Sequence, residues 1–211
     1  MATRELARSA ADFLPARKTL AALTRAARDC QGCDLYQRAT QTVFGAGSAK
    51  ARMILVGEQP GDQEDLQGKP FVGPAGRLLD EALAAAGIAR SDVYLTNAVK
   101  HFKWTPRGKR RLHAKPGSRE ITACRPWLSA EIDVIEPGLI VCLGATAAQS
   151  LLGRSFRITK QRGKLLASSL ARRILATYHP SAVLRAPDEA RRHQMRDELF
   201  ADLRVAAEAL A

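Results

Sequence analysis

The chain has 211 residues, of which 46% are hydrophobic and 26% are charged. These proportions are ordinary for a soluble globular protein, and they argue against collagen-like sequence, a coiled coil or disorder along the whole chain. Lysine and arginine number 33 against 21 acidic residues, a net charge of +12, which favours polyanions or an anionic membrane surface as partners.

Membrane insertion and secretion are not expected. The sequence contains no apolar run close to the roughly 20 residues that a membrane span needs. Residues 1–15 mix charged residues with alanines and lack the apolar core of a signal peptide. We therefore expect a cytoplasmic protein, and we expect it to be a monomer.

Apolar runs and helix-boundary residues predict that strands and helices alternate along the chain. In order, we expect a helix at 18–29, a strand at 53–56, a loop at 58–73, a helix at 74–86, a strand at 93–96 and a cation-rich loop at 98–117. There follow a helix from Ser118 to before Pro137, a strand at 139–143, a helix opened by Gly144, a strand at 174–177 and a long amphipathic helix from about Pro187. Ser118 is the expected N-cap of its helix, and Pro126 should kink that helix or delay its start.

This alternation predicts an α/β fold: a three-layer α/β/α architecture with a central four-stranded parallel sheet. Ligands of such sheets bind beyond the carboxyl ends of the strands. Polar residues follow three of the expected strands there: residues 57–61 (GEQPG), Asn97, and residues 179–181 (HPS). The sequence therefore predicts one site at this edge of the sheet.

Each candidate residue also has a simpler explanation when it is taken alone. Glu58 could activate a nucleophile or stabilise a cation, or it could lie in a solvated turn. The loop that contains it matches neither a Walker loop nor a dinucleotide-binding fingerprint. Phe71, held between prolines and glycines, could stack on a base or belong to the core. Asn97 could pair with the amide-like edge of a base or make a turn. His179 could donate to a carbonyl oxygen or be a structural loop histidine.

The strongest basic cluster is Lys109, Arg110 and Arg111, followed by His113. Phosphate contact is the natural interpretation, and a solvated charged loop is the alternative. His113 could be a further phosphate ligand or a nucleophile.

The four cysteines suggest a metal site. Cys30 and Cys33 form a C-x-x-C pair, which in a reducing compartment favours a metal or cluster over a disulfide. Cys124 and Cys142 complete a possible set of four cysteines. Cys142 lies inside an apolar strand, where a free cysteine packs as a small hydrophobe.

Taken together and in order, these motifs resemble the family 4 uracil-DNA glycosylases, which carry a [4Fe–4S] cluster. The motifs are residues 57–61, 68–76 (GKPFVGPAG), 96–100 (TNAVK) and 179–181, with the paired cysteines. Gln59 and the basic loop that ends in His113 resemble the UdgX branch in particular. The resemblance covers about Cys30 to the last helix. It implies a single uracil-DNA glycosylase-like domain over residues 1–211, with about residues 1–20 as an N-terminal extension.

The resemblance implies a DNA-repair hydrolase whose partner is uracil-containing DNA. Such a protein flips a deoxyuridine out of the DNA and breaks its N-glycosidic bond. By the same resemblance, Phe71 stacks on uracil, Asn97 reads its polar edge, and Gly57 and Asp62 take part in binding uracil. His179 would stabilise the negative charge on the departing base.

In the UdgX branch the loop histidine attacks the sugar carbon and leaves a covalent protein–DNA adduct. The resemblance makes His113 that nucleophile, with Glu58 orienting it or taking its proton, and Gln59 and Arg111 holding the loop and the DNA. Lys109, Arg110, Arg111 and Ser181 are the expected DNA contacts. We expect Lys109, Arg110 and Arg111 to disfavour the imidazolium form of His113, and Glu58 to favour it.

The resemblance also proposes the cluster ligands. Family members have a cysteine where this sequence has His101, and their next cysteine matches Cys124. The expected ligands of the [4Fe–4S] cluster are therefore Cys30, Cys33, His101 and Cys124. The all-cysteine set with Cys142 is the alternative ligand set, and zinc is the alternative metal.

Two other functions stay open. The first is a turnover glycosylase, in which water attacks the sugar and His113 contacts phosphate. The second is a non-catalytic, metal-bearing nucleic-acid-binding module.

Overall fold

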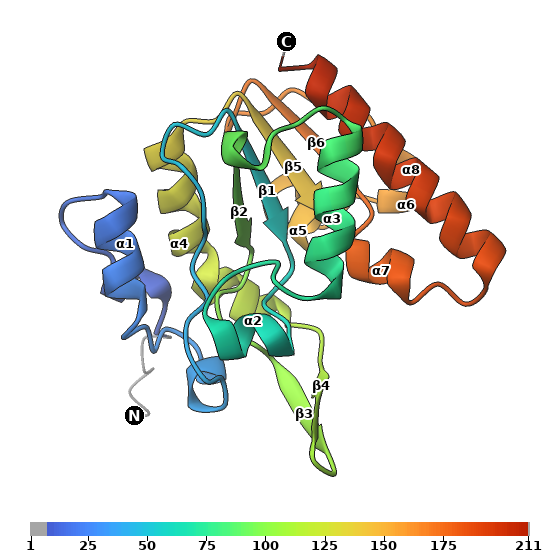
Figure 1. The fold of residues 1–211 in the computed structure, drawn as a ribbon. Coiled ribbons are helices and arrows are strands. Elements are labelled where there is room, and N and C mark those ends of the chain that lie inside the picture. The colour runs from blue at the N-terminus through green and yellow to red at the C-terminus, as the bar shows by residue number, and fades with distance from the viewer. Residues whose placement is uncertain (1–7, 211) are drawn as a thin grey trace.

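The computed structural model describes residues 8–210, and its centre is a parallel sheet (Figure 1). The strands are β1 (Met53–Gly57), β2 (Val93–Asn97), β5 (Leu139–Leu143) and β6 (Arg173–Thr177), in the order β2-β1-β5-β6. The chain passes from β1 outward to β2 and then returns to the other side of β1, so the strand order reverses between β1 and β5. Ligands of such sheets bind beyond this switch point.

Both faces of the sheet are buried, because successive apolar side chains of each strand point to opposite sides. On one face Leu55, Val141 and their neighbours pack against α3 (Pro74–Ala85), α7 (Pro180–Leu184) and α8 (Glu189–Glu208). On the other face Ile54, Ile140 and their neighbours pack against α4 (Ser118–Ile135) and α5 (Ala145–Leu152). The predicted three-layer α/β/α fold with four parallel strands is confirmed.

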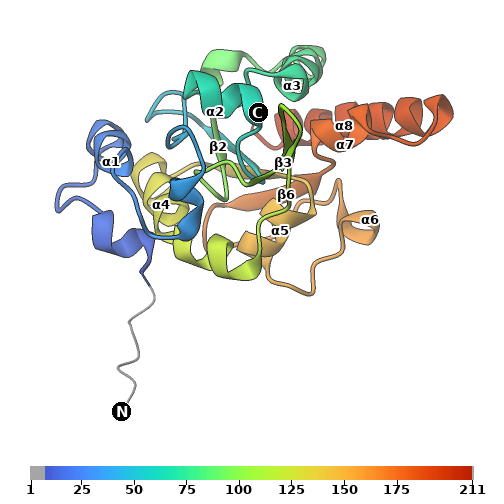
Figure 2. The ribbon, with the colours of Figure 1, turned by 90° about the horizontal axis from the view of Figure 1, so that it is seen from below.

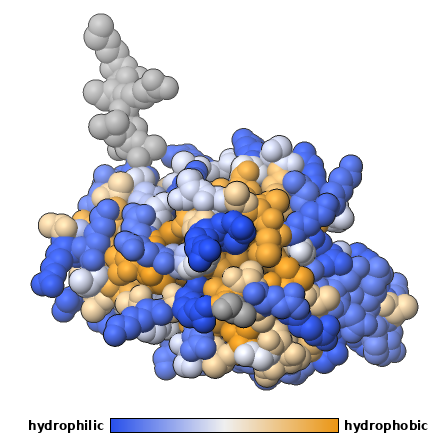
Figure 3. All heavy atoms as spheres, turned by 90° about the horizontal axis from the view of Figure 1, so that it is seen from above, coloured by the Kyte–Doolittle hydropathy of each residue, from blue (hydrophilic) through white to orange (hydrophobic). Residues whose placement is uncertain are grey.

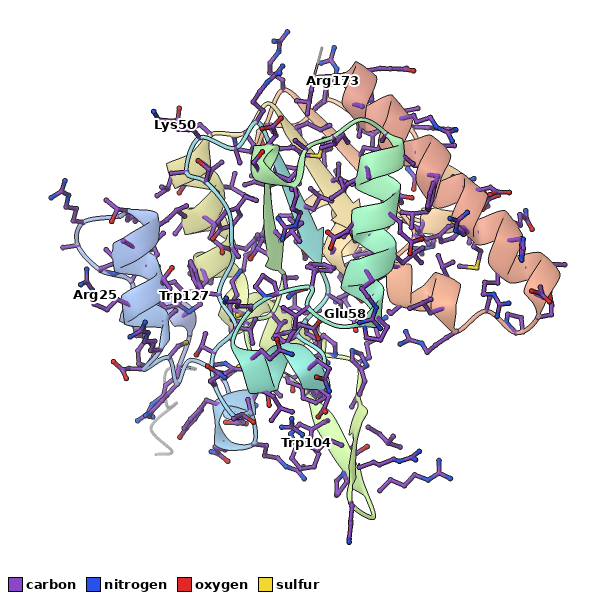
Figure 4. The ribbon with its side chains drawn as sticks, viewed as in Figure 1. Arg25, Lys50, Glu58, Trp104, Trp127 and Arg173 are labelled. Atoms are coloured by element: carbon purple, nitrogen blue, oxygen red, sulfur yellow. The ribbon has the colours of Figure 1, made fainter. Side chains whose placement is uncertain are left out.

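A third apolar cluster lies outside α4. It joins the 3-10 turn η1 (Ala10–Phe13), the helix α1 (Leu20–Ala27) and the turn η2 (Asp34–Gln37) to Trp127 of α4. Figure 2 shows α1 beside α4, and Figure 4 places Trp127 between them. Of the expected N-terminal extension, residues 1–7 lie outside the described residues, and Ala10 is buried in this cluster.

Two segments expected as loops contain regular structure. Residues 58–73 include α2 (Asp62–Gln67), and residues 98–117 include the hairpin of β3 (Trp104–Arg107) and β4 (Arg110–His113). Neither shows apolar periodicity: α2 opens with three acidic residues, and the hairpin carries Pro106 and several cations. The hairpin turn is possible because Gly108 takes a φ of 58°. Figure 1 shows the hairpin projecting from the carboxyl end of the sheet.

The boundaries of α4 differ from those expected. Gly117, not Ser118, is the N-cap, and the Glu120 carboxylate accepts the Gly117 N–H at 2.5 Å. Pro126 lies inside the helix, so the expected delay of its start does not occur. Burial of Trp127 and Leu128 offsets the hydrogen bond that proline removes.

The remaining elements are short: the 3-10 turn η3 (Arg90–Asp92) before β2 and α6 (Ile158–Gln161) before β6. No helix within residues 8–210 carries an apolar stretch long enough to cross a membrane. Figure 3 views the end opposite the hairpin, where hydrophilic side chains surround patches of apolar ones.

Candidate active site

A cavity of about 470 Å³ opens at the carboxyl edge of the sheet, over the switch point. Its walls come from the segments after β1, β2 and β5, from the end of β4 and from α7. Eight predicted site residues line it: Glu58, Gln59, Asp62, Phe71, Asn97, His113, His179 and Ser181. A volume of this size accommodates a nucleobase and its sugar.

The inner wall of the cavity is built by Asn97 and Phe71 around Gly57. Asn97 is buried at the end of β2, paired in register with Gly57 of β1. A methyl group on Gly57 would overlap the side chains of both Asn97 and Phe71, so the glycine lets these two side chains approach each other.

The backbone of Phe71 is strained. Its φ is 56°, a left-handed conformation that costs a non-glycine residue about 1–3 kcal/mol. Gly76 makes room for it, because a side chain there would overlap the Phe71 carbonyl group. Such strain is typical of functional sites, and here it holds an aromatic ring at the cavity wall.

His179 presents a neutral imidazole to the cavity. Burial, the nearby positive charge of Arg185 and the imidazole of His113 together lower its pKa to about 4. Its Nδ1 accepts the Ser181 backbone N–H at 3.1 Å, so the ring proton resides on Nε2. The imidazole therefore offers one N–H donor, and its ring stacks against Phe71 at a centroid distance of 6.0 Å.

His113 and Glu58 meet at the opening of the cavity. The distance between His113 Nε2 and Glu58 Oε1 is 3.3 Å, and the second Glu58 oxygen accepts the Thr146 hydroxyl. Burial lowers the pKa of His113, Glu58 raises it, and Arg185 lowers it. The expectation that Lys109, Arg110 and Arg111 act on this imidazole is wrong, since the cation that lowers its pKa comes from the end of α7.

Gln59 fixes both ends of the hairpin. Its side-chain Nε2 donates to the carbonyl oxygens of Lys103 and Ala114, each at 3.1 Å, and its Oε1 accepts the Lys103 N–H at 3.2 Å. These two residues immediately precede β3 and follow β4. The side chain is buried, so these hydrogen bonds do not compete with bulk water.

Arg111 faces α2 rather than open solvent. It donates to Asp62 at 2.7 Å and to the fully buried Asp65 at 2.6 Å, and it stacks over Phe102 and Trp104. Figure 4 shows Trp104 between the hairpin and α2. These contacts tie the hairpin to α2, in keeping with the loop-holding role that the family resemblance implied for Arg111. Its contact with DNA stays a prediction.

Lys109 and Arg110 lie at the exposed tip of the hairpin and do not line the described cavity wall. The cavity residues that sequence reasoning missed include Thr146, which holds Glu58, and Arg185. Thr146 follows the end of β5. Strand-end site residues were predicted only from the segments after the other three strands, and the segment after β5 would have added Thr146. Arg185 had no signal beyond its proximity to residues 179–181.

Three predicted metal ligands lie together. Cys30, Cys33 and Cys124 belong to the third apolar cluster, and the Cys30 and Cys33 sulfurs are close enough to influence the Cys124 thiol. Cys124 Sγ accepts the Lys100 backbone N–H at 3.2 Å, and Cys30 Sγ accepts the Trp127 indole N–H at 3.2 Å. Such hydrogen bonds to sulfur tune iron–sulfur centres, so this environment fits a cluster.

His101 is buried beside this cluster. Its Nε2 lies 2.9 Å from the Thr42 hydroxyl, which itself donates to the Ala27 carbonyl at 2.7 Å. The hydroxyl has one proton, so its oxygen accepts the Nε2–H of His101. Nδ1 is therefore the nitrogen left with a free lone pair, as in a metal-ligating histidine whose other nitrogen is anchored.

Cys142 lies elsewhere, on β5 in the second apolar cluster, and burial alone raises the pKa of its thiol to about 12. Among residues 8–210, no three His, Cys, Asp or Glu side chains are close enough together to hold a single metal ion. A tetrahedral zinc ion requires such a group, whereas a four-iron cluster is larger than one ion.

Comparison with known proteins gives a consistent picture. A family model described as the uracil DNA glycosylase superfamily matches residues 44–204. The type-4 uracil-DNA glycosylase of Archaeoglobus fulgidus is 38% identical over 195 residues, which cover 88% of this chain and 90% of that protein. The type-4 uracil-DNA glycosylase of Thermotoga maritima is 40% identical over 172 residues, covering 81% and 86%.

Proposed function

Since the chain belongs to the uracil DNA glycosylase superfamily and is homologous to its type-4 members, we propose that it excises uracil from DNA and retains the abasic sugar on His113. One observation carries the covalent step: the His113 imidazole, 3.3 Å from the Glu58 carboxylate, faces the same cavity as Phe71, Asn97 and His179. The partner is uracil-containing DNA, which a cytoplasmic monomer of this chain would bind.

The first step is cleavage of the glycosidic bond. Flipping a deoxyuridine costs a few kcal/mol, which stacking of the base on Phe71 helps to offset. The electron pair of the C1′–N1 bond leaves with uracil, whose negative charge spreads onto its carbonyl oxygens. The Nε2–H of His179 donates to this anion, and the low pKa of His179 keeps the imidazole a neutral donor that does not transfer its proton.

The second step is capture of the sugar cation. The unprotonated nitrogen of His113 donates its lone pair to C1′ and forms a carbon–nitrogen bond. The ring is then an imidazolium, which loses its other proton, and Glu58 can accept it at 3.3 Å. Because the imidazole is held beside C1′, it can attack the sugar faster than water does. Water does not readily hydrolyse the new carbon–nitrogen bond, so each protein molecule reacts once.

The names of the relatives favour a second candidate, a turnover uracil-DNA glycosylase. In that enzyme water is the nucleophile, Glu58 orients it, and His113 contacts phosphate. A non-catalytic module is disfavoured by the convergence of eight predicted site residues in one cavity.

We further propose that Cys30, Cys33, His101 and Cys124 hold a [4Fe–4S] cluster. The sulfur hydrogen bonds and the anchored Nε2 of His101 support this ligand set. When bound, the cluster supplies a rigid cross-link between the N-terminal segment, the end of β2 and α4. We assign it no step in the reaction.

The decisive experiment mixes the protein with a labelled oligonucleotide that contains one uracil and resolves the products on a denaturing gel. We expect a shifted band that survives heat and denaturant, at one DNA per protein, with one equivalent of uracil released. His113→Ser should abolish the band and release uracil with turnover, because water can enter the vacated space. Catalytic uracil release by the wild-type protein without a shifted band would support the turnover enzyme instead.

A further inference from the structure

A fully buried ion pair lies behind the cavity. The Lys100 ammonium and the Glu131 carboxylate of α4 are both 0% exposed, and their N–O distance is 2.5 Å. Neither residue is among the described residues that line the cavity. Withdrawing two charges from water costs several kcal/mol each, and apolar residues often replace such pairs without loss of stability. The pair therefore calls for an explanation other than stability.

The hydrogen bonds of the pair converge on the end of β2. The three ammonium protons of Lys100 go to Glu131, to the Thr96 hydroxyl at 2.5 Å and to the Asn97 carbonyl at 2.9 Å. Glu131 in turn accepts the hydroxyls of Thr96 and Tyr94, each at 2.9 Å. Every ammonium donor is used, and two of the three acceptors belong to the last two residues of the strand.

We propose that Lys100 is a positioning residue for base recognition: its ammonium, fixed by Glu131, holds the Asn97 backbone so that the Asn97 amide keeps one orientation toward the base. This inference rests on the proposed function of the cavity.

Orientation matters because an amide has one donor end and one acceptor end. Uracil presents a carbonyl oxygen beside an N–H, whereas cytosine presents an amino group beside a ring nitrogen that accepts. A fixed Asn97 therefore matches uracil and mismatches cytosine, and an amide free to rotate would match either base. The side chain of Asn97 is only 3% exposed, so little besides its own backbone and its neighbours sets its orientation.

The test removes both charges together, so that no unpaired charge stays buried. Lys100→Met with Glu131→Gln keeps an acceptor for the Tyr94 and Thr96 hydroxyls. The matched control is Arg162→Met with Asp202→Asn and Glu198→Gln, which removes a mostly buried group of ion pairs near the end of β6, away from Asn97. Single-turnover rates are measured against DNA concentration, with uracil or cytosine at the target position, alongside thermal midpoint and iron content.

We expect the Lys100/Glu131 double variant to fold and to reach half of its maximal rate at the same DNA concentration as the wild-type protein. Its maximal rate with uracil should be about 10- to 100-fold lower. Its preference for uracil over cytosine should fall, while the control variant keeps the wild-type preference. A folded double variant with wild-type rate and preference would overturn the inference.

A second variant covers failure to fold. Lys100→Gln with Glu131→Gln also removes both charges, and its two amides can still hydrogen-bond within the buried site, so it should lower the preference in the same direction. An unchanged preference in folded Lys100→Gln/Glu131→Gln protein would also overturn the inference. Failure of the uracil excision on which the inference rests is distinguishable, because wild-type protein would then neither form an adduct nor release uracil.

Discussion

At the scale of single residues, burial gives this protein neutral imidazoles in its cavity. It lowers the pKa of His113 and, more strongly, that of His179. Hydrogen bonds then decide which nitrogen carries the proton. Nδ1 of His179 accepts a backbone N–H, so Nε2 is the donor, whereas Nε2 of His101 donates to Thr42 and leaves Nδ1 free. His179 is thereby suited to donate a hydrogen bond, and His101 is suited to be a metal ligand.

The pH dependence of adduct formation follows from the lowered pKa of His113. The attacking imidazole must be neutral, and it is neutral above its pKa. The rate should therefore stay level from pH 8 down through about 6.5, the ordinary value for histidine, and fall only at lower pH. Arg185→Gln removes a cation that lowers this pKa, so the decline should begin at higher pH, while Glu58 continues to act in the opposite direction.

The control for this profile is Arg185→Lys, which keeps the charge and should retain the wild-type midpoint. Single-turnover adduct rates across pH measure both variants. Superimposable profiles for wild type and Arg185→Gln would show that Arg185 does not set the charge state of His113.

The metal-ligand assignment is also a residue-scale prediction. His101→Ala should lose most of the bound iron and the visible absorbance of the cluster, because it removes a ligand. Cys142→Ala should retain both, since Cys142 lies on β5, in a different apolar cluster from the other three cysteines. Iron per protein and the absorbance spectrum decide between them. Loss of iron in Cys142→Ala alone would favour the all-cysteine set.

At the scale of elements, the hairpin β3–β4 depends on its anchors more than on its own sequence. It is two-stranded, and such hairpins are marginal in water by themselves. Gln59 joins its two ends, and Arg111 ties its second strand to Asp62 and Asp65 of α2. These contacts bring His113, the last residue of β4, to the cavity.

Gln59→Leu should slow adduct formation. It removes the hydrogen bonds between Gln59 and the half-buried backbone of Lys103 and Ala114, at a cost of about 1–3 kcal/mol, and loosens the hairpin that carries His113. Gln149→Leu is the control, since Gln149 also donates to a backbone carbonyl, that of Phe156, but far from the hairpin. Gel-based rates and thermal midpoints measure both. Equal loss of stability with equal rates in the two variants would argue against the anchoring role.

At the scale of the whole molecule, the chain carries a net charge of +12, and cations lie at both ends of the sheet. The hairpin tip with Lys109 and Arg110 extends from the end that bears the cavity, whereas Arg173 lies at the opposite end (Figure 4). None of the ion pairs formed within residues 8–210 involves Lys109 or Arg110. These two charges are therefore available to phosphate.

Replacing Lys109 and Arg110 by glutamine should weaken binding to single-stranded DNA and reduce its salt dependence. Each phosphate contact contributes about 0.7 to the slope of log K against log salt, so the slope should shrink by about 1.4. The same change at Arg172 and Arg173, which are also exposed, should leave the slope nearly unaltered. Fluorescence anisotropy with a labelled oligonucleotide at several salt concentrations measures it. Equal slopes for the two double variants would remove the hairpin tip from the DNA contacts.

The sequence by itself determined the sheet and the strand ends over which the cavity lies. The strands are short apolar runs buried on both faces, so local composition suffices to find them. Parallel strands end at one edge, and the segments that follow β1, β2 and β6 therefore had to converge, which brings Glu58, Asn97 and His179 together.

The tertiary structure alone decided what surrounds these residues. Helix α2 and the hairpin lack apolar periodicity and exist through long-range hydrogen bonds, such as those from Gln59 and Arg111. The cation beside His113 is Arg185, which is distant in sequence, and the pair of Lys100 with Glu131 joins residues 31 positions apart. Burial and hydrogen-bond pairing between distant segments leave no local pattern, because each depends on what the rest of the chain brings alongside.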